Sequence, residues 1–409
     1  MVLGGRAVRS QAPSVPAAFR RSLQAFNPDV SAIVDLYYHA DDSREGVGHL
    51  LEEIAGFGHA HDDGDGHRHG PEEGFNLRHV ELYVSADVDP YFKGSAIAAV
   101  DVHEAELETA EIETTALPWG LKLRGGKFYS DFGRINPQHS HQWDFVDRPL
   151  IHRLALGDHG LNDIGLQLTW LAPTPFYLLA GVEAFQGDNE AMFAHRGEQP
   201  LPSREGPRVG VGWLKAGPSL EGPHALQFGV FGAVGRHQEE HDGDGDGEPD
   251  HWLDGENAFW GGDLVYKYDA SRPNGEGDFV AQAEYFRRRK DLDLVAHDLR
   301  PDLVGRVRTD EQDGYYVQAV YGVAPRWRLG ARWEQAGLIN ESELPNGAME
   351  SFGVSHRASL MVDFTPSEFS RIRLQVARGS YATEEGREEA FEVWAQWMIS
   401  IGAHGAHKF

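Results

Sequence analysis

The sequence predicts an all-β protein, a transmembrane antiparallel β-barrel of about 16 strands with long extracellular loops and short periplasmic turns. Three observations carry this prediction. Apolar and polar residues alternate in runs of nine or more, aromatic residues stand near the ends of the apolar faces, and short connections alternate with long polar ones. No Pro/Ser-rich linker divides the 409 residues into separate domains.

The alternation is clear in "HVELYVSADVD" (79–89) and "FEVWAQWMISI" (391–401), where apolar residues such as Leu82 occupy every second position and polar residues such as Glu81 lie between them. A soluble β-sandwich also alternates, but its strands usually have about five or six residues. A strand that crosses a bilayer needs about 9–11. The expected aromatic girdle at the membrane interfaces consists of Trp170, Trp213, Trp260, Tyr268, Trp327, Trp333 and Phe364.

Sixteen strands are expected, with fourteen or eighteen as alternatives. The fourth is the least regular, because Glu108, Glu111 and Glu113 interrupt its alternation. The expected strands cover residues 30–41, 75–88, 91–103, 107–117, 120–132, 164–172, 176–187, 208–216, 224–237, 259–270, 277–289, 313–323, 327–336, 352–365, 370–381 and 389–402. The expected outer loops lie near 42–74, 134–163, 188–207, 238–258, 290–312 and 337–351.

Residues 1–26 are expected to form an N-terminal segment on the periplasmic side and residues 27–409 the outer-membrane barrel. The first residues lack the apolar stretch of a complete signal peptide. The absence of cysteine excludes disulfides, thiolate zinc sites and a cysteine nucleophile, and the net charge of -27 argues against nucleic acid as a partner. Ser355 and His356 are adjacent, so they point to opposite faces of a strand and cannot form a catalytic pair; the chain is not expected to be an enzyme.

Five segments carry a resemblance to a known family. They are "NPDVSAIVD" (27–35), "GFNLRHVELYVSADVDPYFKGSA" (74–96), "GGKFYSDFGRINPQHSHQWDFVDRPL" (125–150), "GLNDIGLQLTWLAPT" (160–174) and "GAHGAHKF" (402–409). They resemble plug-less outer-membrane barrels often labelled zinc-regulated or TonB-dependent outer-membrane receptors, which are distantly porin-like. The resemblance implies a bacterial outer-membrane barrel with a link to metal uptake. Because only about 26 residues precede the first expected strand, a passive or ligand-gated pore is expected rather than a plugged receptor.

Two expected loops are rich in residue types that can act as metal ligands. The first combines imidazole and carboxylate groups, which suit zinc, nickel or copper; the alternative is a solvated loop. The second begins like a calcium loop, D-x-D-x-D-G, but Leu253 stands where the bidentate glutamate belongs, so calcium or another divalent ion competes with a solvated acidic loop. The candidate ligands are His59, His61, Asp63, Asp65, His67 and His69 in the first loop and Asp242, Asp244, Asp246 and Asp250 in the second.

A third loop, near 134–163, carries apolar residues that would not remain in water, including Phe145, Val146 and Leu150. A long loop with its own apolar side is expected to fold into the barrel and narrow it. The alternative is structural packing across the barrel mouth. The residues expected to line the constriction are His139, His141, Asp144, Asp147 and His152.

Charged residues on the polar faces are expected to line the lumen, with acids gathered on the earlier strands and arginines on the later ones. Opposed charges of this kind orient small polar solutes, unless they simply pair and hold the barrel round. The set includes Glu81, Asp87, Lys122, Arg124, Arg328, Arg332, Arg371 and Arg373.

These patterns favour a porin-like outer-membrane channel for small polar or ionic solutes, linked to divalent metal (zinc) uptake through its acidic, histidine-bearing loops. The alternative is a non-conducting surface barrel whose loops bind an ion or a partner protein. Outer-membrane lipids or lipopolysaccharide, small solutes and metal ions are the expected partners. A homotrimer is a candidate assembly, and the oligomeric state stays open.

Overall fold

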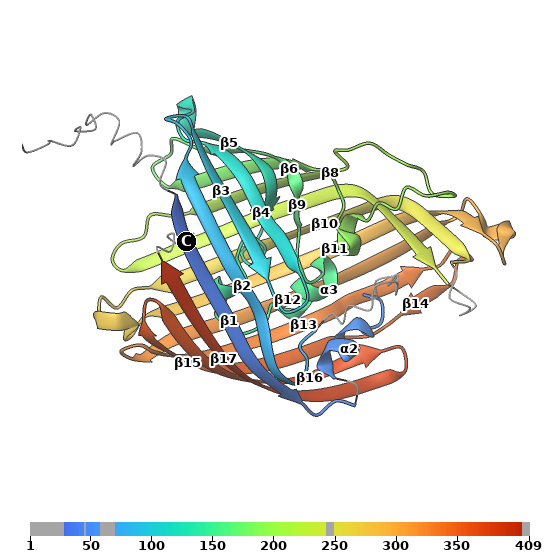
Figure 1. The fold of residues 1–409 in the computed structure, drawn as a ribbon. Coiled ribbons are helices and arrows are strands. Elements are labelled where there is room, and N and C mark those ends of the chain that lie inside the picture. Colours follow the sequence, from blue (N-terminus) through green and yellow to red (C-terminus); the bar gives the residue numbers. More distant parts are fainter. Residues whose placement is uncertain (1–27, 45, 58–69, 243–248, 403–409) are drawn as a thin grey trace, which may run out of the picture.

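Sixteen long antiparallel strands hydrogen-bond in a closed ring, in which β1 (Asp29–Asp41) pairs with both β2 (Gly74–Asp87) and β17 (Gly386–Gly402) (Figure 1). The computed structural model describes residues 28–44, 46–57, 70–242 and 249–402. A further strand, β14 (Met349–Ser351), pairs only with the end of β13. The prediction of a barrel of about 16 strands is confirmed. The predicted segment 1–26 lies outside the described residues.

Every expected strand has a counterpart. The remaining strands are β3 (Phe92–Val100), β4 (Ala105–Thr114), β5 (Leu121–Tyr129), β6 (Asn162–Leu171), β7 (Tyr177–Phe185), β8 (Val209–Gly217), β9 (His224–His241), β10 (His251–Tyr268), β11 (Phe279–His297), β12 (Val307–Ala324), β13 (Trp327–Glu343), β15 (Ser355–Ser367) and β16 (Ser370–Thr383). The helices are α2 (Val47–Glu52), α3 (Leu150–Leu156) and α4 (Glu190–Phe193), with 3-10 turns η1 (Pro118–Gly120), η2 (Ser140–Gln142), η3 (Pro273–Gly275) and η4 (Pro301–Leu303). None of the described helices is long and apolar enough to cross a membrane.

The barrel wall is apolar outside and polar inside, as the alternation predicts. Leu82 is 43% exposed on the outer face, whereas its neighbour Glu81 is 2% exposed. The expected girdle residues Trp170, Trp260, Trp327 and Trp333 are likewise exposed. The prediction is wrong for Trp213, which is buried and donates a hydrogen bond to Glu183 (Nε1–Oε1, 2.8 Å). In β8 its side chain takes the inward position.

Strands β9 to β13 have 17 to 19 residues and project beyond the others on the loop side (Figure 1). The predicted loops 238–258 and 290–312 are therefore mostly strand. Beyond the bilayer both faces of a strand meet water, so polar sequence is compatible with strand pairing. Ion pairs between neighbouring strands, such as Arg289 with Glu311 (Nη1–Oε1, 2.7 Å), support these extensions.

A β-bulge explains the irregular fourth strand. Ile97 of β3 pairs with Thr109 of β4, but the next residue, Ala98, pairs with Leu107, so Glu108 has no partner in β3. Such a bulge shifts the phase of the side chains. Leu107 points outward (51% exposed), while Glu108 and Thr109 are both buried. The bulge adds a carboxylate to the barrel interior.

The described parts of three connections on the loop side fold into the barrel instead of into solvent. They contain α2, α3 and α4, and their apolar side chains form one buried cluster with the inner wall. Phe132, for example, packs on Phe231 and Phe259 of the wall with ring centroids 5.1 and 5.0 Å apart. The barrel interior is therefore polar along its wall but holds an apolar core between the inward-folded connections.

Candidate constriction site

The connection between β5 and β6, named here the inward segment (residues 130–161), crosses the barrel interior. Phe145, Val146 and Leu150 are each 0–1% exposed, which confirms that this segment folds inward. It is held by polar contacts to both sides of the barrel. Asp144 and Asp147 face arginines of the later strands. His139 and His141 face carboxylates of earlier strands.

Two aspartates of the inward segment contact arginines of the later strands. Asp144 accepts a hydrogen bond from Arg328 of β13 (Nη1–Oδ1, 3.0 Å). Asp147 accepts from Arg332 (Nη2–Oδ1, 2.7 Å) and forms an ion pair with Arg357. Burial alone would raise the pKa of Asp147, but the charges of Arg332 and Arg357 outweigh it and hold that pKa below its usual value. Both aspartates predicted to line the constriction are therefore anionic anchors of the inward segment.

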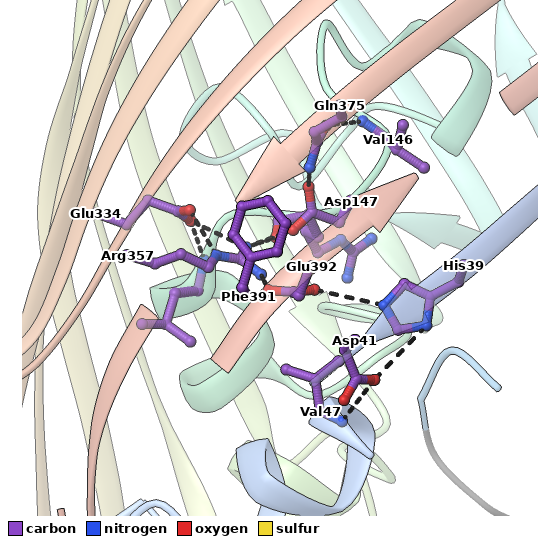
Figure 2. Close-up of polar contacts among 12 residues, drawn as sticks. His39, Asp41, Val47, Val146, Asp147, Glu334, Arg357, Gln375, Phe391 and Glu392 are labelled. Carbon is purple, nitrogen blue, oxygen red and sulfur yellow. Dashed lines mark hydrogen bonds and ion pairs between the residues drawn. The ribbon is translucent and has the colours of Figure 1, made fainter. Parts of the chain in front are cut away.

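Figure 2 shows how this anchor continues to the first connection. Arg357 also pairs with Glu334 (Nε–Oε2, 2.9 Å) and with Glu392 (Nη1–Oε1, 3.5 Å). Glu392 lies 3.8 Å from the buried His39, which lies 3.9 Å from Asp41. Asp41 then accepts a hydrogen bond from the backbone N–H at the start of α2. One polar network thus joins two inward-folded connections to the wall.

Two histidines of the inward segment face carboxylates of the earlier strands. His139 Nδ1 lies 3.2 Å from Glu108 Oε2 of β4, and His141 Nδ1 lies 3.0 Å from Glu81 Oε2 of β2. The Tyr129 hydroxyl donates to the other oxygen of Glu108 (2.6 Å). A cavity of about 190 Å³ adjoins this group and is lined by Glu81, His139 and His141. These two predicted constriction histidines therefore border open space inside the barrel.

His152 takes a different position, since it is fully buried on α3 and its Nε2 lies 2.9 Å from Glu284 Oε2 of β11. It packs edge-on against Phe286 with the ring centroids 4.7 Å apart. The prediction that His152 lines the path is wrong, because this side chain belongs to the packed core between α3 and the wall.

Most of the predicted lumen charges are buried in ion pairs or contact the inward segment, and two are exposed. Arg124 is buried between Glu111 and Asp131, and Arg373 is fully buried and donates to the Trp143 carbonyl oxygen (2.9 Å). Arg328, Arg332 and Arg371 also contact the inward segment. Asp87 and Lys122 are the exceptions, because both are exposed near the turn-side ends of β2 and β5 and take no part in this buried network.

The predicted metal-binding loops are described only in part. His59, His61, Asp63, Asp65, His67 and His69 lie outside the described residues, as do Asp244 and Asp246. Asp242 is described beside β9, and Asp250 is buried beside His251 (Oδ1–Nδ1, 2.5 Å). The calcium prediction for 242–250 stays a prediction.

At the rim, the predicted ligand Asp250 lies in a cluster with His251 and His297, named here the rim cluster. One ligand atom from each lies within 4.8 Å of the others. The rings of His241, His251 and His297 follow one another across β9, β10 and β11 with centroids 5.0 and 4.9 Å apart. The three histidines stand on three successive strands, and the strand register pairs His251 with both His241 and His297.

Ser355 and His356 lie as the alternation predicts. The Ser355 hydroxyl is buried and accepts a hydrogen bond from the Ala382 N–H (2.9 Å), whereas His356 stacks on the outward-facing Trp333. The two side chains occupy opposite faces of β15 and share no site.

No protein-family model matches the chain. It is similar to an uncharacterised protein of Aquifex aeolicus (strain VF5), with 36% identity over 399 residues that cover 95% of this chain and 81% of that protein.

Solved structures of similar fold include in-vitro folded OmpT of Vibrio cholerae in its trimer form, with a TM-score of 0.55, 13% identity and coverage of 92% of this chain and 99% of that one. The outer-membrane channel DcaP of Acinetobacter baumannii has a TM-score of 0.52, 13% identity and coverage of 92% and 96%. The anion-selective porin of Comamonas acidovorans has a TM-score of 0.50, 11% identity and coverage of 92% and 99%. The shared fold is the bacterial outer-membrane barrel.

Proposed function

The chain belongs to the same family as the Aquifex aeolicus protein and is a bacterial outer-membrane β-barrel, and from this premise we propose that it is a porin-like channel for small polar or ionic solutes. The observation that carries the proposal is the inward segment, which spans the barrel between carboxylates on one side and arginines on the other. Opposed charges across a narrow passage orient and select polar solutes.

Divalent cations are the solutes we propose, with zinc as the first candidate. The net charge of -27 favours cations at the barrel entrance. The rim cluster adds a carboxylate and two imidazoles, which zinc, nickel and copper all accept. The candidate homotrimer and the contacts with outer-membrane lipid or lipopolysaccharide stay predictions; OmpT of Vibrio cholerae is described in a trimer form.

Deleting residues 138–157 and bridging the ends with Gly-Ser is expected to raise single-channel conductance in planar bilayers, because the inward segment then no longer narrows the passage. A milder variant, Asp144→Asn, should shift the reversal potential toward anions, since it removes a negative charge beside Arg328. Asp158→Asn, on the exposed part of the same segment, is the matched control and should leave selectivity unchanged. Unaltered conductance in a folded deletion variant would remove the inward segment from the path.

The alternative proposal is a non-conducting barrel whose loops bind an ion or a partner protein. The observation that favours it is the apolar cluster between the inward-folded connections, which excludes water from part of the interior. This alternative predicts that the folded wild-type barrel shows no conductance steps in planar bilayers. The deletion variant should then conduct, because the inward segment no longer closes the interior.

Zinc binding to the outer loops is expected to be micromolar at about pH 7.5 and largely lost at about pH 5.5, because imidazole must be deprotonated to bind metal and its usual pKa is about 6.5. Isothermal titration should show weaker binding after replacement of His59, His61, His67 and His69 by alanine. A further loss should follow His251→Ala and His297→Ala at the rim cluster. Equal binding by all variants would assign the metal to other ligands.

A further inference from the structure

A compact group of metal-ligating side chains lies inside the barrel, separate from the loops at the rim. Glu81 from β2, Glu108 from β4 and His139 from the inward segment each offer a ligand atom, and these atoms all lie within 4.8 Å of one another. His141 follows on η2 and faces Glu81. We propose that Glu81, Glu108, His139 and His141 form a binding site for a divalent transition-metal ion of the zinc class.

The spacing of the paired atoms fits shared coordination. A tetrahedral ion with bonds of about 2.0–2.2 Å to nitrogen and oxygen places two of its ligand atoms about 3.3–3.6 Å apart, slightly farther than in these pairs. The observed distances are 3.2 Å from His139 to Glu108 and 3.0 Å from His141 to Glu81. The two imidazole rings are nearly parallel, at 12°, with centroids 5.8 Å apart. Glu81, Glu108 and His139 already offer three atoms within 4.8 Å of one another, and rotation of the His141 side chain, which faces Glu81, would supply the fourth ligand.

The donor set selects the class of metal. Two imidazoles and two carboxylates suit zinc, cobalt, nickel or copper, whereas calcium and magnesium prefer oxygen ligands alone. Glu81 and Glu108 are only 2% and 9% exposed, so their two negative charges are largely removed from water. A bound dication would neutralise that charge where burial makes it costly.

The surroundings support the same interpretation. The Tyr129 hydroxyl holds one oxygen of Glu108, and the Ser140 hydroxyl hydrogen-bonds with His79 Nε2 (3.2 Å), which in turn lies 3.9 Å from Glu81. Partners of this kind orient ligands around metal ions. The bulge in β4 turns Glu108 inward, and the adjoining cavity of about 190 Å³ gives an ion room to reach the group.

This inference deepens the proposed function and rests on it for the role of the ion as a permeant solute, but binding is measurable without a pore. The experiment uses the full chain in detergent, with the four histidines of the first loop and the two of the rim cluster replaced by alanine to remove the outer ligands. Cobalt(II) chloride is the probe, because tetrahedral cobalt has a strong visible absorption. We expect one cobalt ion per chain, displaced by zinc.

His139→Ala and His141→Ala should each raise the dissociation constant for cobalt at least about tenfold. Glu108→Gln keeps the size of the side chain and should have the same effect, which guards against a simple loss of folding. The matched control is His159→Ala on the same segment, because His159 is 64% exposed near Glu106 and should not alter binding.

Two results would overturn the site: a spectrum of octahedral cobalt only, or equal cobalt affinity in the folded His139→Ala, His141→Ala and control proteins. Either would show that the histidines only tether the inward segment. Conductance of the same samples separates the two proposals. Tetrahedral binding in a barrel that does not conduct supports the site and refutes the channel. Conductance without tetrahedral binding refutes the site and leaves the channel.

Discussion

Replacing Arg357 with methionine is expected to destabilise the barrel by about 3–5 kcal/mol, because it removes a buried cation that three carboxylates share. Arg357 is 3% exposed and contacts Asp147, Glu334 and Glu392 (Figure 2). The measurement is the free energy of unfolding by urea in detergent micelles or lipid vesicles. Loss of this arginine should also release the inward segment, which limited proteolysis would detect.

The matched control is Arg378→Met. Arg378 pairs with Glu389 on the next strand, but their side chains are 73% and 59% exposed, and exposed pairs contribute at most about 1 kcal/mol. Equal destabilisation by the two substitutions would contradict the structural role of the buried network.

The same network predicts a pH dependence. The folded-state pKa of Asp147 lies below its usual value of about 3.9, so its contribution to stability is present above that value and is lost as the pH falls toward the folded-state pKa. Asp147→Asn should therefore lose stability at neutral pH and show a smaller further loss in acid than the wild type.

Leu82→Arg is expected to destabilise the barrel by about 2–4 kcal/mol, because the guanidinium would face lipid near the middle of the bilayer. Leu82 is 43% exposed in the centre of β2, opposite Ala32 of β1 and Ala98 of β3. Unfolding in lipid vesicles measures the effect.

The control for depth is Phe75→Arg at the loop-side end of the same strand, where Phe75 is 85% exposed. Arginine near the interface costs about 0–1 kcal/mol. Similar costs at both positions would mean that the outer face of β2 does not meet a membrane. Leu82→Met should be nearly neutral, since it retains an apolar side chain.

Much of the constriction could be predicted from composition and spacing. The apolar residues of 134–163 had no place in water, so the sequence predicted inward folding, and the structure confirms it at Phe145 and Leu150. His139, His141, Asp144 and Asp147 were predicted to line the constriction. The structure places all four in contact with the wall, and their place along a solute path stays a prediction. The carboxylate of Glu108 was missed as their partner, although the break in the alternation of the fourth strand was its visible signal.

Charged composition misled the assignment of the outer loops. The segment "KDLDL" (290–294), for example, was assigned to an outer loop, yet it forms part of β11, where Lys290 pairs with Glu239 of β9. Trp213 was misplaced for a related reason, because its aromatic character fits an interface and an interior equally well. Only its pairing with Glu183 shows which one it occupies.

The sequence by itself predicted a barrel of about 16 strands, the lipid-facing side of most of them and the inward course of the long connection after β5. These follow from period-two alternation and from the cost of leaving apolar side chains in water, which are properties of short segments. Only the tertiary structure decided which charges meet. Asp147 pairs with Arg332 185 residues away, and His152 meets Glu284 132 residues away, because closure of the ring places β13 and β11 beside the inward segment. The bulge in β4 likewise turns Glu108 toward His139.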